Sequence, residues 1–409
     1  MPFRTLKLHP SLLAGLKELG YARPTPIQAE AIPPAMAGKD VLASAMTGSG
    51  KTVAFLLPIL HSLIARPRGT TRALVMVPTR ELAAQVLDNL NELGVHTPIS
   101  AAAVYGGVAL RPQEHAFRSG ADVLIATPGR LLEHMRAPYG KLAGLEHLVI
   151  DEADRMLDMG FLPDIRRVLR HLPARRQTLF FSATMPSAIV ALTREMLRDP
   201  VTINIQRQSA PAVGITQAVY PVAQDLKSVM LLTLLRRGDM QQALVFTRTK
   251  HRANRVYEYL VRNSVHAERI HGNRSQSQRT QALSGFKSGR YRVLVATDIA
   301  ARGLDIESIS HVMNYDMTDT ADAYIHRIGR TGRAERTGDA FTLVTDDDDE
   351  MIRALEKIMN QRLPRQTLPD FDYSAAAPAV DPSRVPVPRG PKPLHHEPHW
   401  RPNHHPRQK

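Results

Sequence analysis

The sequence predicts an α/β protein of two tandem domains, each a doubly wound parallel sheet, followed by a disordered basic tail. Short apolar runs alternate with helical patterns, and this alternation is interrupted near position 206 and stops near position 363. Apolar runs of about four residues are typical of strands buried on both faces of a parallel sheet. At 409 residues the chain is also too long for one ordinary core. We place the boundaries at 1–206 for the first domain, 207–216 for a linker, 217–363 for the second domain and 364–409 for the tail.

Composition narrows the classes of function. A formal net charge of +14 indicates a polyanionic partner, because clustered Lys and Arg displace counterions from a phosphate backbone, although charge alone does not separate nucleic acid from an acidic membrane. The absence of cysteine excludes disulfides, thiolate metal sites and cysteine nucleophiles. The amino terminus lacks the apolar core of a signal peptide, and the most apolar stretch, Val53 to Ala65, is too short to cross a bilayer. We therefore expect a cytoplasmic protein without a membrane partner.

The first chemical motif follows a predicted strand at 41–43. The run from Ala45 to Thr52 matches the phosphate-binding loop, with Ala45 where the first glycine usually stands. Glycines let backbone amides curl around phosphate oxygens, Lys51 reaches the β- and γ-phosphates, and the Thr52 hydroxyl is placed to bind Mg²⁺. The predicted nucleotide-binding residues of this loop are Thr47, Gly48, Ser49, Gly50, Lys51 and Thr52.

A second motif lies where the predicted strand at 148–150 ends in Asp151, Glu152 and Asp154. The carboxyl ends of parallel strands are where open α/β sheets bind ligands, so these carboxylates should enter a cleft. Taken alone, the pattern is as consistent with a strand that ends in solvated acids. Together with the phosphate loop upstream, it predicts a site for a magnesium nucleotide.

Two further predicted strands, 74–77 and 123–126, also end in small polar residues and an arginine. Each alone is consistent with a strand-to-helix turn that a threonine caps. Their repetition would line hydroxyls, amides and guanidinium groups along one sheet edge, which suits a sugar-phosphate backbone. The residues predicted to bind there are Arg80, Gly107, Thr127 and Arg130.

These motifs, together with Ser182-Ala183-Thr184, resemble those of the DEAD-box RNA helicases, and within that family the bacterial RhlE type. The resemblance implies two RecA-like domains, and ATP and Mg²⁺ as nucleotide and metal. The stretch from Gly20 to Gln28 resembles the glutamine motif of the family, which includes Tyr21 and implies that Gln28 reads adenine while Phe3 stacks on the ring. On its chemistry alone, Gln28 is more often a surface or capping residue.

In the second half, predicted strands at 243–246 and 292–296 lead to Thr247 and Thr297, and the run from His326 to Arg333 carries arginines at a spacing of three. A solvated basic helix is the alternative interpretation of that run. The resemblance implies that Arg330 and Arg333 reach the γ-phosphate and that Gly303 and Asp305 bind the nucleotide. It also implies RNA contacts by Thr247, Gln276, Arg279 and Thr297.

The resemblance further implies a mechanism. Thr52 and Asp151 would hold the metal, and Glu152 would orient and deprotonate the attacking water. The residues implied to couple hydrolysis to RNA binding are Asp154, Ser182, Thr184 and His326. The substrate would be single-stranded or short duplex RNA, unwound locally. Two alternatives stay open, an ATP-gated RNA clamp and a DNA helicase with the same motor. The sequence does not identify partners in ribosome assembly or RNA decay.

Overall fold

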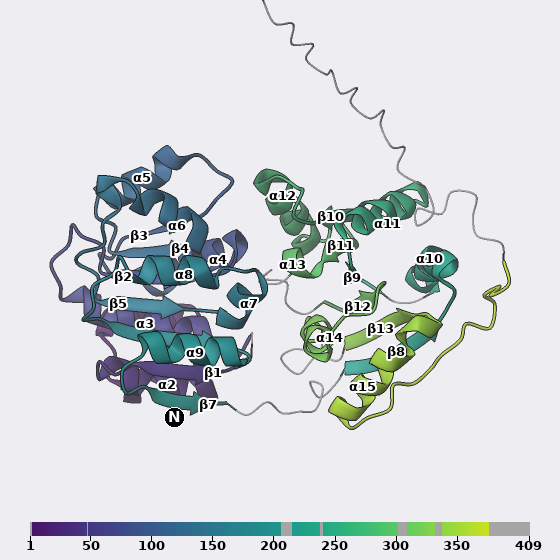
Figure 1. Ribbon diagram of the computed structural model, residues 1–409, viewed down its shortest axis with the longest axis horizontal. Helices are drawn as coiled ribbons and strands as arrows, with labels where there is room; N and C mark the ends of the chain where they lie inside the picture. The colour runs from purple at the N-terminus through teal and green to yellow at the C-terminus, as the bar shows by residue number, and fades with distance from the viewer. Residues whose placement is uncertain are drawn as a thin grey trace, which may run out of the picture.

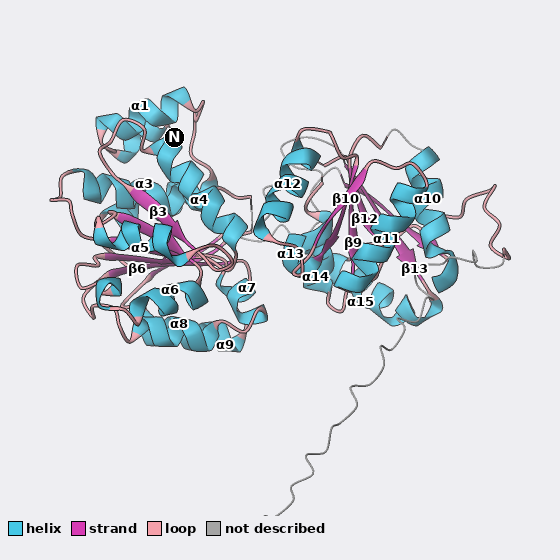
Figure 2. Ribbon diagram, turned by 90° about the horizontal axis from the view of Figure 1, so that it is seen from above, coloured by secondary structure: helices cyan, strands magenta, loops and turns pink. Residues whose placement is uncertain are grey.

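The chain forms two α/β domains, each built on a parallel sheet, that lie side by side (Figure 1). The structure is a computed structural model, and it describes residues 2–46, 48–205, 215–237, 240–301, 309–331 and 338–375. Figure 2 shows that α12, α13 and α14 lie on the side of the second domain that faces the first. The predicted fold class is confirmed, because each domain consists of a parallel sheet with helices on both faces.

The first domain holds a seven-stranded parallel sheet in the order β3-β4-β2-β5-β6-β1-β7. Its strands are β1 Val41–Ser44, β2 Ala73–Met76, β3 Ala101–Val104, β4 Val123–Ala126, β5 His147–Ile150, β6 Gln177–Ser182 and β7 Val201–Asn204. The central strands β2, β4 and β5 are buried along their whole length. This explains why their sequences read as unbroken apolar runs.

Helices cover both faces of this sheet, and alternate strand residues point to opposite faces. Ala73 and Val75 pack with α1 to α4, whereas Leu74 and Met76 pack with α5 to α9. The α-helices are α1 Pro10–Glu18, α2 Pro26–Met36, α3 Lys51–Ile64, α4 Arg80–Leu93, α5 Leu110–Arg118, α6 Pro128–Met135, α7 Ala153–Asp158, α8 Leu162–Leu169 and α9 Ser187–Met196. Two 3₁₀ turns, η1 Phe3–Leu6 and η2 Pro138–Gly140, complete the described part of this domain.

The second domain repeats the design with a six-stranded sheet in the order β10-β11-β9-β12-β13-β8. Its strands are β8 Ile215–Pro221, β9 Ala243–Thr247, β10 Ala267–Ile270, β11 Val293–Thr297, β12 His311–Asn314 and β13 Gly338–Val344. Its helices are η3 Gln224–Leu226, α10 Lys227–Arg237, α11 Lys250–Arg262, α12 Gln276–Lys287, α13 Asp298–Ala301, α14 Ala321–Ile328, η4 Asp346–Asp348 and α15 Asp349–Met359. Within the described ranges, no helix is long and apolar enough to span a membrane.

The structure corrects two of the predicted boundaries. β8 begins at Ile215, inside the stretch predicted as a linker, and most of that stretch lies outside the described residues. The predicted tail was placed too early, since residues 364–375 pack on the second domain. The backbone of Val219 in β8 bonds to Pro364 and Gln366, and Leu368 and Phe371 are buried in the core beside α10 and α11. The proline-rich composition had indicated that residues 364–375 bury too little apolar surface to offset the entropy cost of ordering them. The burial of two large apolar side chains within four positions supplies that surface.

We predict that a chain ending at residue 363 is less stable than one ending at residue 375. Loss of the buried Leu368 and Phe371 side chains should lower the free energy of unfolding of the second domain by about 3–5 kcal/mol. Chemical denaturation of the two truncated chains measures the difference. Leu368→Ala in the longer chain should reproduce part of the loss, and equal midpoints for all three proteins would contradict the packing role of residues 364–375.

Candidate active site

The loop between β1 and α3 is shaped to enclose an anion. Gly48 and Gly50 adopt φ angles of 83° and 93°, a left-handed conformation that glycine reaches without a Cβ clash. α3 begins at Lys51, so the first free amides of the helix face the loop. The Lys51 ammonium is buried and its Nζ donates to the carbonyl oxygen of Ala45 at 3.0 Å. Thr47, also predicted for this loop, lies outside the described residues.

Residues at the start of α2 form hydrogen bonds to the backbone of the phosphate loop. Gln28 is 1% exposed, its Oε1 accepts from the Thr25 amide at 2.9 Å, and its Nε2 donates to the carbonyl of Gly50 at 3.1 Å. The Thr25 hydroxyl donates to the carbonyl of Ser49 at 2.8 Å. Gln28 is therefore a capping residue of α2 that also ties this helix to the loop, and its predicted contact with adenine stays a prediction.

The two predicted aromatic contacts differ in exposure. Tyr21 is 39% exposed and lines the central cavity, whereas Phe3 is 4% exposed and packs in the core. Their rings meet edge to face, with centroids 6.2 Å apart. In this arrangement Tyr21 borders the cavity, and Phe3 packs against the Tyr21 ring from the core.

Asp151 and Glu152 follow β5 and are both buried, and their pKa values shift in opposite directions. Burial raises the pKa of Asp151 to about 6, although Lys51 acts against this shift. Burial also acts to raise the pKa of Glu152, but Arg155 and Lys51 outweigh it and lower the pKa to about 2. The negative charge of Asp151 is only partly balanced by neighbouring positive charge, so this carboxylate is suited to bind a cation. Glu152 already has an arginine partner and stays ionised.

Glu152 is held in an unusual backbone conformation. Its φ of 52° is left-handed, which costs a residue with a Cβ about 1–2 kcal/mol. The Glu152 amide donates to Asp151 Oδ1 at 2.9 Å, and its carboxylate accepts from Arg155 Nη1 at 2.8 Å. Both partners are local, so the turn fixes the direction in which this side chain enters the cavity.

Asp154, Ser182 and Thr184 form one hydrogen-bonded group between the end of β6 and α7. Asp154 Oδ2 accepts from the Thr184 amide at 2.9 Å and from the Thr184 hydroxyl at 3.0 Å. The Ser182 hydroxyl donates to the Thr184 carbonyl at 2.7 Å and accepts from the Asp154 amide at 3.2 Å. The structure thus brings three of the four predicted coupling residues together beside Glu152.

A cavity of about 680 Å³ lies between the domains. The first domain contributes the phosphate loop, Asp151 and Glu152, and the second contributes Arg279 and Arg330. Arg330 is buried and near enough to lower the pKa of Glu152, and it lines a small adjoining pocket together with His326 and Asp154. The other residues predicted to approach the nucleotide from the second domain, Gly303, Asp305 and Arg333, lie outside the described residues.

On the first domain, the residues predicted to bind RNA form a continuous group at the carboxyl edge of the sheet. The Arg80 guanidinium lies against Gly107, so close that a Cβ on Gly107 would meet Arg80 Nη1 at 1.8 Å. Arg130 donates to the carbonyl of Val108 at 3.0 Å and pairs with Glu133. Thr127 immediately precedes α6. The spatial grouping expected from the repeated strand-to-helix turns is therefore present.

On the second domain, the predicted RNA-binding residues are less exposed. Thr247 is fully buried and its hydroxyl donates to the Thr249 and Ala296 carbonyls, so its side chain shapes the loop after β9. Thr297 ends β11 and is also buried. Gln276 and Arg279 reach across to Glu81 on the first domain, at 3.1 Å in both cases. They act as contacts between the domains here, and their RNA contacts stay predictions.

Sequence reasoning missed three residues that hold this site. Thr25 and Gln28 form a capping box, a signal that the Thr-x-x-Gln spacing carried. Arg155 stands three residues after Glu152, a spacing that places both on one helical face. Glu81 gave no such signal, because its partners lie almost two hundred residues away in the second domain.

Two parallel-sheet domains that line one cavity with a glycine-rich loop, two carboxylates and an arginine are typical of nucleotide-dependent motor proteins. Residues 25–192 match the family described as DEAD/DEAH box helicase, and residues 226–335 match the helicase conserved C-terminal domain. The chain is 40% identical to the DEAD-box ATP-dependent RNA helicase RhpA of Helicobacter pylori, over 90% of this chain and 75% of that protein. It is 40% identical to the ATP-dependent RNA helicase DeaD of Buchnera aphidicola, of which it spans 62%. The chain belongs to the DEAD-box helicase family.

Solved structures support the same assignment. Dbp5 of S. cerevisiae bound to RNA and ADP BeF3 is 30% identical, with a TM-score of 0.80 over 90% of this chain and 96% of that chain. A DEAD box protein from Methanococcus jannaschii is 33% identical over 90% of this chain and 99% of that chain, yet its TM-score is 0.52.

We predict that Mg²⁺-dependent binding of ADP weakens as the pH falls through about 6. If Asp151 is a metal ligand, as the sequence predicts, its proton must leave before Mg²⁺ binds. Because the pKa of Asp151 is raised to about 6, ADP affinity should then fall about tenfold per pH unit below 6 and level off above it. Glu152 stays ionised throughout this range. Calorimetry with ADP, with Mg²⁺ or with EDTA, measures the effect. Because ADP itself titrates, Asp151→Asn is the control and should lose the part due to the protein.

We predict that Gly107→Ala weakens RNA binding without changing ADP affinity. The new Cβ would displace the Arg80 guanidinium, at a cost in RNA affinity of about 1 kcal/mol, or close to fivefold. Gly160→Ala is the matched control, because Gly160 has a φ of 76°, similar to the 81° of Gly107, but has open space around it. Fluorescence anisotropy with labelled RNA compares the variants. Equal losses in both would reduce the effect to backbone strain.

Proposed function

We propose that this chain is an ATP-dependent RNA helicase that hydrolyses ATP in the interdomain cavity and separates short RNA duplexes locally. One observation carries the proposal: Lys51, Asp151 and Glu152 from the first domain and Arg330 from the second line the same cavity. A protein that only bound nucleotide would not need an acid and an arginine from opposite domains beside the phosphate position. The names of the helicase relatives support the same activity.

In this proposal the roles follow from the charges. Lys51 and the loop amides neutralise the β- and γ-phosphates, and Arg330 adds positive charge where it develops during phosphoryl transfer. Glu152, with its pKa lowered to about 2, is a weak base at rest. It therefore first orients the attacking water as a hydrogen-bond acceptor, and it takes the proton only as the bond to phosphorus forms and the water becomes more acidic.

The residues at the cavity also fit a magnesium ion. Asp151 is a buried carboxylate whose pKa is raised because Lys51 compensates its burial only in part, and Thr52 supplies a hydroxyl at the same cavity. Carboxylate and hydroxyl oxygens are the ligands that Mg²⁺ prefers. Bound Mg²⁺ would offset charge on the β- and γ-phosphates. The proposed protein ligands are Asp151 and Thr52, as the sequence predicted.

RNA would bind across both domains at the sheet edge that carries Arg80, Gly107 and Arg130. The TM-score of 0.80 against Dbp5 bound to RNA and ADP BeF3 supports an arrangement in which both ligands would be engaged. Asp154 lines a small pocket together with Glu152 and with His326 and Arg330 of the second domain. Because Asp154 is hydrogen-bonded to Thr184 and Ser182, this group is suited to report closure to the catalytic acid. The RhlE subtype and a cytoplasmic location stay predictions of the sequence.

Steady-state ATP hydrolysis, measured alone and with RNA or matched DNA at fixed salt, tests this function. Strong stimulation by RNA and little by DNA is expected. Equal stimulation would favour a general nucleic-acid helicase, and RNA binding without hydrolysis would favour the clamp. Glu152→Gln should keep ATP and RNA affinity and lose most turnover, by a factor of about 10² or more. Equal loss of binding and turnover in this variant would assign Glu152 a structural role.

A further inference from the structure

A buried polar group in the second domain connects α14, which ends two residues before Arg330, with the loops that carry the predicted RNA contacts Thr247 and Thr297. We call Asp298, Asp316 and Arg327 the junction. Asp316 follows β12 and Arg327 lies in α14, and both are only 3% exposed. The junction lines none of the cavities described above, so the proposed chemistry of the cavity does not by itself require it.

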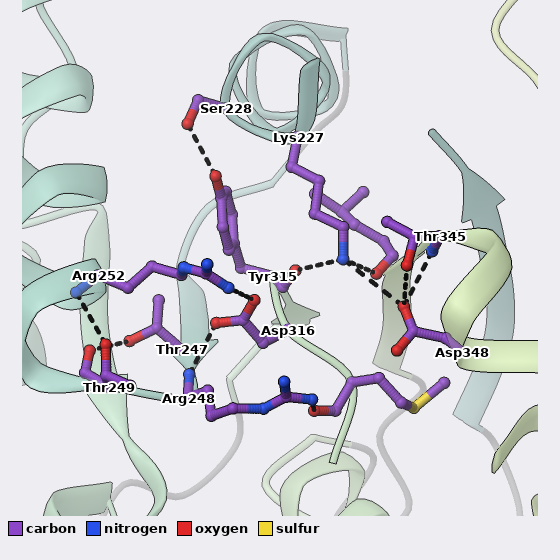
Figure 3. Close-up of polar contacts among 12 residues, drawn as sticks. Lys227, Ser228, Thr247, Arg248, Thr249, Arg252, Tyr315, Asp316, Thr345 and Asp348 are labelled. Atoms are coloured by element: carbon purple, nitrogen blue, oxygen red, sulfur yellow. Dashed lines mark hydrogen bonds and ion pairs between the residues drawn. The ribbon is translucent and has the colours of Figure 1, made fainter. Parts of the chain in front are cut away.

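The Asp316 side chain holds the loop that follows β9. Its Oδ2 accepts from the backbone amide of Arg248 at 2.8 Å, and its Oδ1 pairs with Arg252 Nη1 at 2.5 Å (Figure 3). The Arg248 guanidinium donates in turn to the carbonyl of Met317 at 3.3 Å. The stretch 247–249, which includes the predicted RNA contact Thr247, is thus fixed to the end of β12.

The Asp316 backbone carbonyl contacts Arg327 in α14. Arg327 Nη1 donates to the Asp316 carbonyl at 2.6 Å and to Asn314 Oδ1 at 3.2 Å. Its remaining nitrogens form a two-pronged ion pair with Asp298, at 2.6 and 2.7 Å. Asp298 directly follows Thr297, a second predicted RNA contact. Arg330 stands three residues after Arg327, beside the cavity.

Lys227 in α10 also contacts the segment after β12 that contains Asp316. Its Nζ donates to the carbonyls of Tyr315 and Leu343, at 3.3 and 2.9 Å, and lies 3.8 Å from Asp348 (Figure 3). Residues 315 and 316 therefore cannot shift without breaking contacts to α10, α11 and α14 together. Apolar residues could fill this space at a lower desolvation cost, whereas directional ion pairs hold the surrounding loops and helices in one fixed relation.

We propose that Asp316 is a positioning residue, because its side chain holds the loop that carries Thr247 and its carbonyl accepts from Arg327 in α14. The loops presenting Thr247 and Thr297 to RNA, α14 and the segment after α14 that presents Arg330 to ATP would then move as one body. The inference rests on the proposed function. RNA that moves the loop after β9 or the start of α13 would then also move Arg330 relative to Glu152. The junction transmits position within the second domain, while Asp154, Ser182 and Thr184 act within the first.

Asp316→Asn tests the inference in the full-length protein. The amide still accepts from Arg248 but leaves Arg252 without a charged partner. We expect the RNA concentration for half-maximal ATPase stimulation to rise about tenfold and the RNA-saturated kcat to fall, as is typical of lost coupling, while ADP affinity is unchanged. Arg327→Lys, which keeps the charge but loses the fork to Asp298, should give the same pattern if Asp316→Asn folds poorly.

Asp40→Asn is the matched control. Asp40 is a buried carboxylate of the first domain that accepts from the Thr178 and Arg198 amides, both at 2.7 Å, away from the cavity. It should lower the Tm without changing the response to RNA. If both junction variants also lowered only the Tm, the inference would be overturned. If the unmodified protein showed no RNA stimulation, the proposed function itself would fail, so the two failures are distinguishable.

Discussion

The structure depends on the burial of two adjacent carboxylates, Asp151 and Glu152, at the end of the central strand β5. Two like charges out of water are costly, and each is stabilised by different means. Glu152 has Arg155 on the next helical turn, whereas the charge on Asp151 is only partly compensated by Lys51. This asymmetry suits Asp151 to bind a cation and keeps Glu152 ionised, so that it can accept a hydrogen bond from water.

The second domain completes this charge balance from across the cavity. Arg330 approaches Glu152 at one end, and Arg279 pairs with Glu81 at the other. Neither end belongs to one domain alone, so the cavity has its full set of charges only in the arrangement seen here. Since the contacts between domains named here are polar, ATP and RNA, both polyanions, are suited to govern whether the domains come together.

The sequence predicted six of the thirteen described strands and one side of the site. Runs such as Leu148-Val149-Ile150 are buried on both faces and so carry a clear signal, while β3, an edge strand of three alanines and a valine, carries little. The phosphate loop was predictable because its glycines need left-handed angles. The pairing of Glu81 with Gln276 and Arg279 was not, because local patterns do not encode contacts between domains. The start of the tail was predicted too early, because the proline-rich composition of this segment does not reveal that Leu368 and Phe371 are buried in the core.

The strain at Glu152 and the burial of Asp316 and Arg327 have a common physical meaning. A left-handed glutamate and a buried arginine paired with Asp298 are each less stable than simple alternatives, such as glycine in the turn and apolar side chains in the core. What both provide is a fixed direction. Glu152 must point into the cavity, and Arg330 must stand at a set position relative to the loops after β9 and β11. A motor that links two ligands needs such rigid connections, because a soft one would let either ligand bind without affecting the other.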